Sequence, residues 1–118
     1  MELRYLFRMP TFPVVSNIDG VFIGAKTPEE LSIELGKLHL DRDTSYDLVD
    51  FTGEGWSLYV PKMVISPLTL KKRWTKREII KLFNERKNIE LGEGKKYSEK
   101  SLSAKRLDKI ILDLVEIS

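Results

Sequence analysis

This chain of 118 residues contains no cysteine, and that absence excludes three kinds of chemistry at once. Without thiols there is no disulfide, no thiolate ligand for a metal and no cysteine nucleophile. The chain also lacks any apolar run near the ~20 residues that a membrane-spanning helix needs. Its first apolar stretch, in residues 1–10, is interrupted by Arg4 and Arg8, which favours a strand over a signal peptide. We therefore expect a cytoplasmic protein.

Short motifs with a known chemistry are scarce as well. There is no nucleophile elbow, no glycosylation triplet and no His-Glu-x-x-His helix. The segment 91–96, Leu-Gly-Glu-Gly-Lys-Lys, has the Gly-Lys pair of a phosphate-binding loop, but position 89 is Ile and position 96 is Lys. That loop needs a glycine at the first of these positions and Ser or Thr at the second, so a plain linker is favoured. We expect no cofactor and no catalytic activity.

The composition is that of an ordinary folded protein, with 42% hydrophobic and 32% charged residues. The length favours a single globular domain over residues 1–118. Net charge is only +2, but it is distributed unevenly. Residues 1–60 carry 5 basic and 10 acidic side chains, whereas residues 61–118 carry 15 basic and 8 acidic ones. Such asymmetry is typical of a face for an acidic partner, or of two halves that attract each other.

Local patterns in the first third predict strands and one helix. Residues 2–9 alternate between apolar and polar side chains, which is the period of a half-buried strand. The pair Asp19-Gly20 stands between two apolar runs and is a favoured two-residue hairpin turn. Thr27 fits an N-cap, and leucines at helical spacing follow it. We therefore expect a helix over residues 28–40.

A second hairpin is expected in the middle of the chain. Aromatic and β-branched residues, which pack well on a pleated surface, fill residues 46–52 and 56–65. They are joined by the turn Gly53-Glu54-Gly55. Pro61 lacks the amide hydrogen that a ladder needs, so the second strand should be at an edge or bulged there.

Two further helices complete the prediction. Thr75 and Glu78 have the spacing of a capping box, which starts a helix over residues 75–88. Leucine and isoleucine at helical spacing predict a final helix over about residues 102–117. Because strands come first and helices close the chain, we predict an α+β fold. It would be an antiparallel sheet of about five strands with two or three helices packed on one face.

One histidine and two aspartates form the only candidate metal site. His39, Asp41 and Asp43 stand at alternate positions, but a metal held by them would need a fourth ligand from elsewhere. The alternative places His39 in the last turn of a helix, where a partly positive imidazole suits the dipole, and the aspartates in the turn that follows. We favour this alternative and expect no metal.

Carboxylates of the second hairpin are weak candidates for acid–base chemistry. Two carboxylates work together only when they share a site. Asp47 and Asp50 are three residues apart on a strand and should point to opposite faces. We therefore do not expect them to act as a catalytic pair.

Residues 71–87 are the most basic stretch, with eight Lys or Arg against two Glu. On a helix, Lys81 has the spacing to pair with Glu78 or Glu85, so much of the helical charge should be neutralised locally. The unpaired charge is then concentrated in the three residues that precede the helix. The predicted basic patch consists of Lys71, Lys72, Arg73, Arg77 and Lys81.

Two functions remain open, and they belong to different classes. The first is a small cytoplasmic protein without catalytic activity that binds another protein or acidic macromolecule, as an adaptor, immunity-like or antitoxin-like protein does. The second is a nucleic-acid-binding protein that uses the basic segment 71–87. Glu85 on the exposed helix face disfavours docking against phosphate. An enzyme built around His39, Asp41 and Asp43 is the least favoured function, and no membrane partner is expected.

Overall fold

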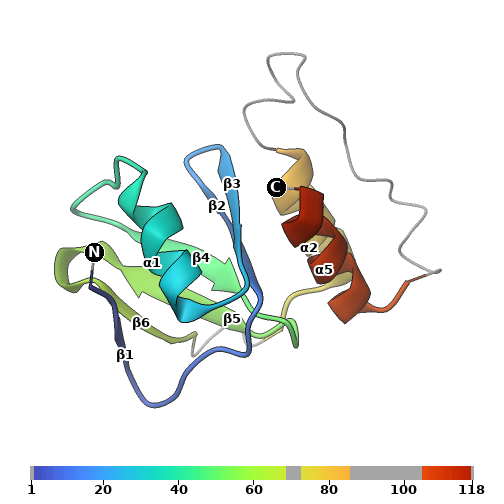
Figure 1. The fold of residues 1–118 in the computed structure, drawn as a ribbon, viewed down its shortest axis with the longest axis horizontal. Coiled ribbons are helices and arrows are strands. Elements are labelled where there is room, and N and C mark those ends of the chain that lie inside the picture. The colour runs from blue at the N-terminus through green and yellow to red at the C-terminus, as the bar shows by residue number, and fades with distance from the viewer. Residues whose placement is uncertain (1, 69–72, 86–104, 118) are drawn as a thin grey trace.

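The computed structural model describes residues 2–68, 73–85 and 105–117, and in it six strands form one mixed sheet (Figure 1). The strand order is β1-β6-β5-β4-β2-β3, and every neighbouring pair is antiparallel except β1 and β6. The strands are β1 (Arg4–Tyr5), β2 (Val14–Ile18), β3 (Val21–Ala25), β4 (Ser45–Val49), β5 (Gly55–Tyr59) and β6 (Val64–Pro67). The predicted α+β class, with a largely antiparallel sheet, is confirmed.

The hairpin of β2 and β3 turns where the sequence predicts. Asp19 and Gly20 occupy the turn with φ of 52° and 91°, the left-handed conformation that this pair accepts readily. The side chain of Asn17 supports the turn, since its Oδ1 accepts a hydrogen bond from the Gly20 amide at 2.7 Å. The register then runs without interruption from Ile18 opposite Val21 toward the far end of the hairpin.

Strands β4, β5 and β6 form a meander in place of the single predicted hairpin. The expected strand over residues 56–65 is divided by a short 3₁₀ turn, η1 (Val60–Lys62), followed by Met63 at φ 49°. Pro61 lies in this turn, where its missing amide hydrogen breaks no ladder bond. The predicted edge or bulge at Pro61 is not what the structure shows: β5 ends at Tyr59 as an interior strand, and the chain resumes after the turn as an additional strand, β6.

The N-terminal strand is shorter than its alternation predicts. Only Arg4 and Tyr5 pair, in parallel with Val64 and Ile65 of β6. The chain then turns at Phe7, whose φ of 70° is incompatible with a strand. The prediction of a strand over residues 2–9 is therefore confirmed only for Arg4 and Tyr5 and is wrong for the rest.

Three helices are described: α1 (Pro28–Gly36), α2 (Lys76–Asn84) and α5 (Leu107–Ile117). Both predicted caps on the first two are present. The Thr27 hydroxyl accepts from the Glu30 amide at 3.1 Å. At α2 the capping box is reciprocal, with bonds of 3.2 Å and 3.0 Å between Thr75 and Glu78. Helix α1 ends four residues before the predicted boundary, so His39 lies beyond it and not in its last turn.

The helices cover both faces of the sheet, which corrects the prediction that they pack on one face (Figure 1). The physical reason lies in β2, where Val14 and Ile18 are buried on one face and Val15 is buried on the other. The α1-side core also includes Ile23, Leu31, Leu35, Leu48, Trp56, Leu58 and Ile65. The α2/α5-side core includes Val49, Trp74, Ile79, Ile80, Phe83, Ile110, Ile111 and Leu114.

Candidate interaction surface

The predicted basic patch is only partly within the described residues. Lys71 and Lys72 lie outside them. Arg73, Arg77 and Lys81 are described, and all three are exposed. Nothing in the structure therefore tests whether the five residues form one surface.

Arg73 is attached to the turn between β4 and β5. It forms an isolated antiparallel bridge with Glu54, and its Nη1 donates to the backbone oxygen of Thr52 at 2.8 Å. The next amide, that of Trp74, donates to the Gly53 oxygen at 2.7 Å. This segment therefore orients the approach to α2, and part of the donor capacity of Arg73 is used within the molecule.

The charges of α2 behave largely as a solvated helix face. Lys81 pairs with Glu85 at 3.6 Å, as its spacing predicts, and both side chains are mostly exposed. Exposed pairs of this kind contribute little to stability. Glu78 completes the capping box with Thr75. Arg77 is exposed one helical turn before Lys81.

The weak metal candidates form no metal site. No group of three or more His, Cys, Asp or Glu side chains that could hold a metal occurs among the described residues. Asp41 instead shapes its own turn, since its Oδ1 accepts from the Asp43 amide at 3.1 Å. The Tyr46 hydroxyl accepts from the Asp41 amide at 3.3 Å and donates to Asp19 at 2.6 Å. This bond to Asp19 is the main cause that raises the pKa of Tyr46 above its usual value.

Asp50 is the most highly coordinated side chain described, and its role was missed from the sequence. The prediction that Asp47 and Asp50 face opposite ways is confirmed, since Asp47 is exposed whereas Asp50 is only 1% exposed. Five donors surround the Asp50 carboxylate at 2.6–3.1 Å. They are the amides of Thr11, Thr52 and Glu54, the Thr52 hydroxyl and the Trp56 indole. The Asp50 carboxylate therefore joins the segment around Thr11, the turn after β4 and the Trp56 side chain through hydrogen bonds.

Arg8 covers this network from the solvent side. Its guanidinium lies 4.9 Å from the centre of the Trp56 ring and binds the Glu54 carboxylate through both terminal nitrogens. The bond to Glu54 raises the pKa of Arg8, so the guanidinium is charged at any accessible pH. The Arg8–Glu54 pair therefore holds the N-terminal segment against the turn between β4 and β5.

On both sides of Arg8, the chain exposes apolar side chains. Leu6, Phe7 and Met9 are 45%, 92% and 50% exposed. The Arg8 amide donates to the Leu6 oxygen at 2.8 Å, and Phe7 between them has φ of 70°. An i to i+2 bond around a residue with positive φ is a strained γ-turn, which is rare for an aromatic residue. We call residues 6–9 the N-terminal loop.

The sequence contained one local signal for Asp50 and none for the N-terminal loop. Asp50 followed by Thr52 and Gly53 is a pattern in which aspartate bonds to the backbone two residues on. The turn at Phe7, by contrast, falls within a run of alternating residues that favours a strand.

Comparison with protein-family models, with curated proteins and with solved structures gave no match. No helix among the described residues is long and apolar enough to cross a membrane.

Proposed function

We propose that this protein is a non-catalytic binding domain and that its N-terminal loop inserts Phe7 into an apolar pocket of a partner protein. The single observation that carries the proposal is the 92% exposure of a phenylalanine in a strained turn. Such a side chain contributes nothing to the core, and the turn that presents it is unfavourable by itself. Strain of this kind persists where the surrounding structure enforces it, and it is concentrated at functional positions.

The surroundings of the loop support this proposal because they fix it at both ends. Before Phe7, the Leu6 amide donates to the Ile65 oxygen of β6 at 2.9 Å. After Phe7, Arg8 is bound to Glu54 and stacked on Trp56. A loop backbone held in its binding conformation loses little conformational entropy on association, and large aromatic residues dominate interface energetics.

The proposal is tested with Phe7→Ala and with a matched control, Val21→Ala, which truncates another exposed apolar residue at a turn. Partners are captured from the source organism with each variant, and candidates are then reconstituted from purified components. We expect a partner that binds the native chain and the control equally but binds Phe7→Ala about 30-fold or more weakly, as for an interface hot spot. Equal affinity of all three proteins would refute the role of Phe7.

Phe7→Gly separates binding from folding. Glycine accepts positive φ without strain, so this variant should keep or slightly raise the free energy of unfolding, by up to about 1 kcal/mol, while binding is lost. A marked loss of stability in urea titration would show that Phe7 is structural.

Binding to either of two other classes of partner, a nucleic acid or a membrane surface, would count against the proposal. Salt-dependent binding to DNA or RNA that Arg77→Glu and Lys81→Glu abolish would favour the nucleic-acid alternative. Binding to anionic vesicles that Phe7→Ala abolishes would favour a membrane surface.

A further inference from the structure

Strand β3 forms one edge of the sheet, and within the described part of the chain no strand pairs with its outer side. In a two-residue hairpin, the residues that flank the turn exchange both hydrogen bonds, and bonded pairs then alternate with non-bonded ones. Val21 and Ile23 therefore bond to β2, whereas the backbone groups of Phe22 and Gly24 point away from the sheet. An edge of this kind is a template for an added strand.

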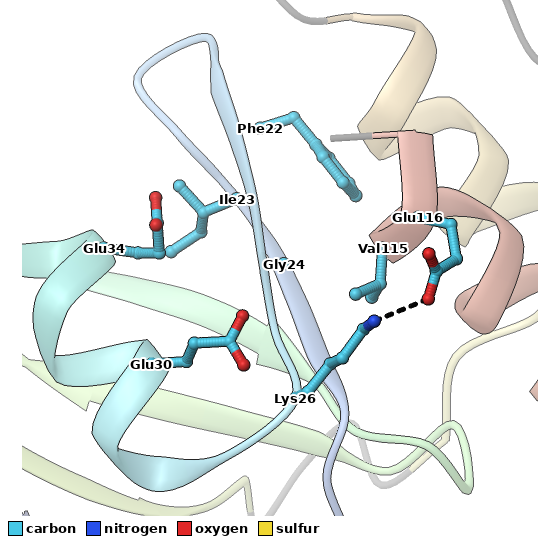
Figure 2. Close-up of a pocket in the computed structure, with 8 residues that line it drawn as sticks. All are labelled: Phe22, Ile23, Gly24, Lys26, Glu30, Glu34, Val115 and Glu116. Carbon is cyan, nitrogen blue, oxygen red and sulfur yellow. Dashed lines mark ion pairs between the residues drawn. The ribbon is translucent and has the colours of Figure 1, made fainter.

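A cleft of 320 Å³ runs along this edge (Figure 2). Helix α1 forms one wall and the end of α5 forms the other, with β3 between them. The lining residues are Phe22, Ile23, Gly24, Lys26, Glu30, Glu34, Val115 and Glu116. A paired strand lies about 4.8 Å from its neighbour, so a chain added beside β3 enters the space between these walls.

On the α1 side of the cleft, the distance between two carboxylates matches the distance between alternate side chains of an extended chain. Glu30 and Glu34 are one helical turn apart, and Figure 2 shows both on the cleft side of α1. Side chains at this spacing are about 6 Å apart on a helix. Alternate side chains on one face of a strand are about 6.8 Å apart. Two basic residues separated by one position in a bound strand would therefore each meet one carboxylate.

On the α5 side of the cleft, an ion pair joins the residue that follows β3 to the end of α5 (Figure 2). Lys26 Nζ lies 2.6 Å from Glu116 Oε1, and the two side chains are 51% and 64% exposed. A pair so exposed opens readily, and an incoming cation can replace Lys26 beside Glu116. Among the residues that line the cleft, three are carboxylates and one is an ammonium. Outside the lining, Lys37 Nζ lies 3.2 Å from Glu34 Oε1, and because this Lys37 side chain is 64% exposed, an incoming cation can replace it there as well. The lining itself carries more negative than positive charge and attracts cations, and the like charge of a second copy disfavours pairing between two β3 edges.

We propose that the β3 edge binds an extended, basic peptide segment of a partner protein as an added strand, with alternate Lys or Arg side chains paired to Glu30 and Glu34. The remaining side chains of the segment would pack on Phe22 and Val115. Main-chain bonds to Phe22 and Gly24 would supply affinity, and the acidic wall would supply specificity. This site is separate from the N-terminal loop and does not depend on it, because β1 and β3 are at opposite edges of the sheet.

The test uses a labelled seven-residue peptide in which lysine alternates with valine. We expect saturable binding by fluorescence anisotropy and slower hydrogen exchange at the Phe22 and Gly24 amides when the peptide is bound. The double variant Glu30→Gln/Glu34→Gln should weaken binding by about tenfold at low salt. The control Glu2→Gln/Glu29→Gln makes the same change of charge outside the cleft and should bind like the native chain.

Two matched peptides separate strand addition from simple charge attraction. A peptide with glutamate in place of lysine should not bind, and a peptide N-methylated at the residues that face β3 should bind much more weakly, because it cannot donate to the edge. Equal affinity for the N-methylated peptide, or equal weakening by the control variant, would overturn the proposal. So would protection of the Phe22 and Gly24 amides that rises with protein concentration in the absence of peptide, since a second copy would then be the occupant.

Discussion

At the scale of single residues, Asp50 shows how one buried carboxylate joins distant parts of a chain. Its donors come from Thr11, from the turn that follows it and from Trp56, and Arg8 covers the group from outside. The sequence identified Asp50 only as a strand carboxylate that faces away from Asp47. It did not reveal the network, because Thr11 is 39 positions away and only the fold brings it near.

Removal of this carboxylate should be among the most damaging single changes in the protein. Asp50→Ala leaves the Trp56 indole and several amides buried without acceptors, so we expect a loss of about 3 kcal/mol or more in the free energy of unfolding. Urea denaturation measures the loss. Asp47→Ala, at an exposed position of the preceding strand β4, is the control and should change stability by less than about 0.5 kcal/mol. Similar values for both variants would show that the network is dispensable.

At the scale of elements, features with a local cause were predicted and features with a distant cause were not. The Asp19-Gly20 turn, the Thr27 cap and the Thr75 capping box depend on neighbouring residues, and all are present. The division of the helices between two faces depends on which side chains of β2 are buried. Because β2 is buried on both faces, its sequence does not alternate between apolar and polar residues, and no such alternation could reveal the two faces. The predicted basic patch stays a prediction, because Lys71 and Lys72 lie outside the described residues; Arg73 is at the surface and donates to the Thr52 oxygen.

The capping box gives a prediction at this scale. Thr75→Ala removes the acceptor for the Glu78 amide, so the free energy of unfolding should fall by about 1 kcal/mol. Thr75→Asn, which keeps a good N-cap, should restore most of it. Equal stability of all three proteins in thermal denaturation would mean that α2 is held by its apolar face alone.

At the scale of the whole molecule, one sheet supports two cores, and each core contains one tryptophan. Trp56 lies in the α1-side core and Trp74 in the α2/α5-side core. Strands β2 and β3 contribute side chains to both cores. If these strands unfold, the apolar side chains of both cores are therefore exposed to water. The two cores should therefore unfold together.

This cooperativity is measurable through the two tryptophans. The variant Trp56→Phe keeps Trp74 and reports on the α2/α5-side core, whereas Trp74→Phe keeps Trp56 and reports on the α1-side core. In urea, the fluorescence transition of each variant should coincide with its loss of far-ultraviolet circular dichroism. Leu35→Ala and Ile80→Ala, one in each core, should each lower stability by about 2–4 kcal/mol and should add within about 0.5 kcal/mol. Separate fluorescence transitions would show that the helices of one face detach independently.

The double burial of β2 also changes what keeps its hairpin aligned. In a sheet with one wet face, a slip of one residue is forbidden because it would drive apolar side chains into water. Side chains on both faces of β2 are buried, so that penalty is weaker for this strand. Alignment then depends on the Asp19-Gly20 turn and on polar contacts such as that of Ser16, whose hydroxyl donates to the Asp47 oxygen at 2.6 Å. This hairpin should therefore accept many exchanges of one apolar residue for another, but not the insertion or deletion of a single residue.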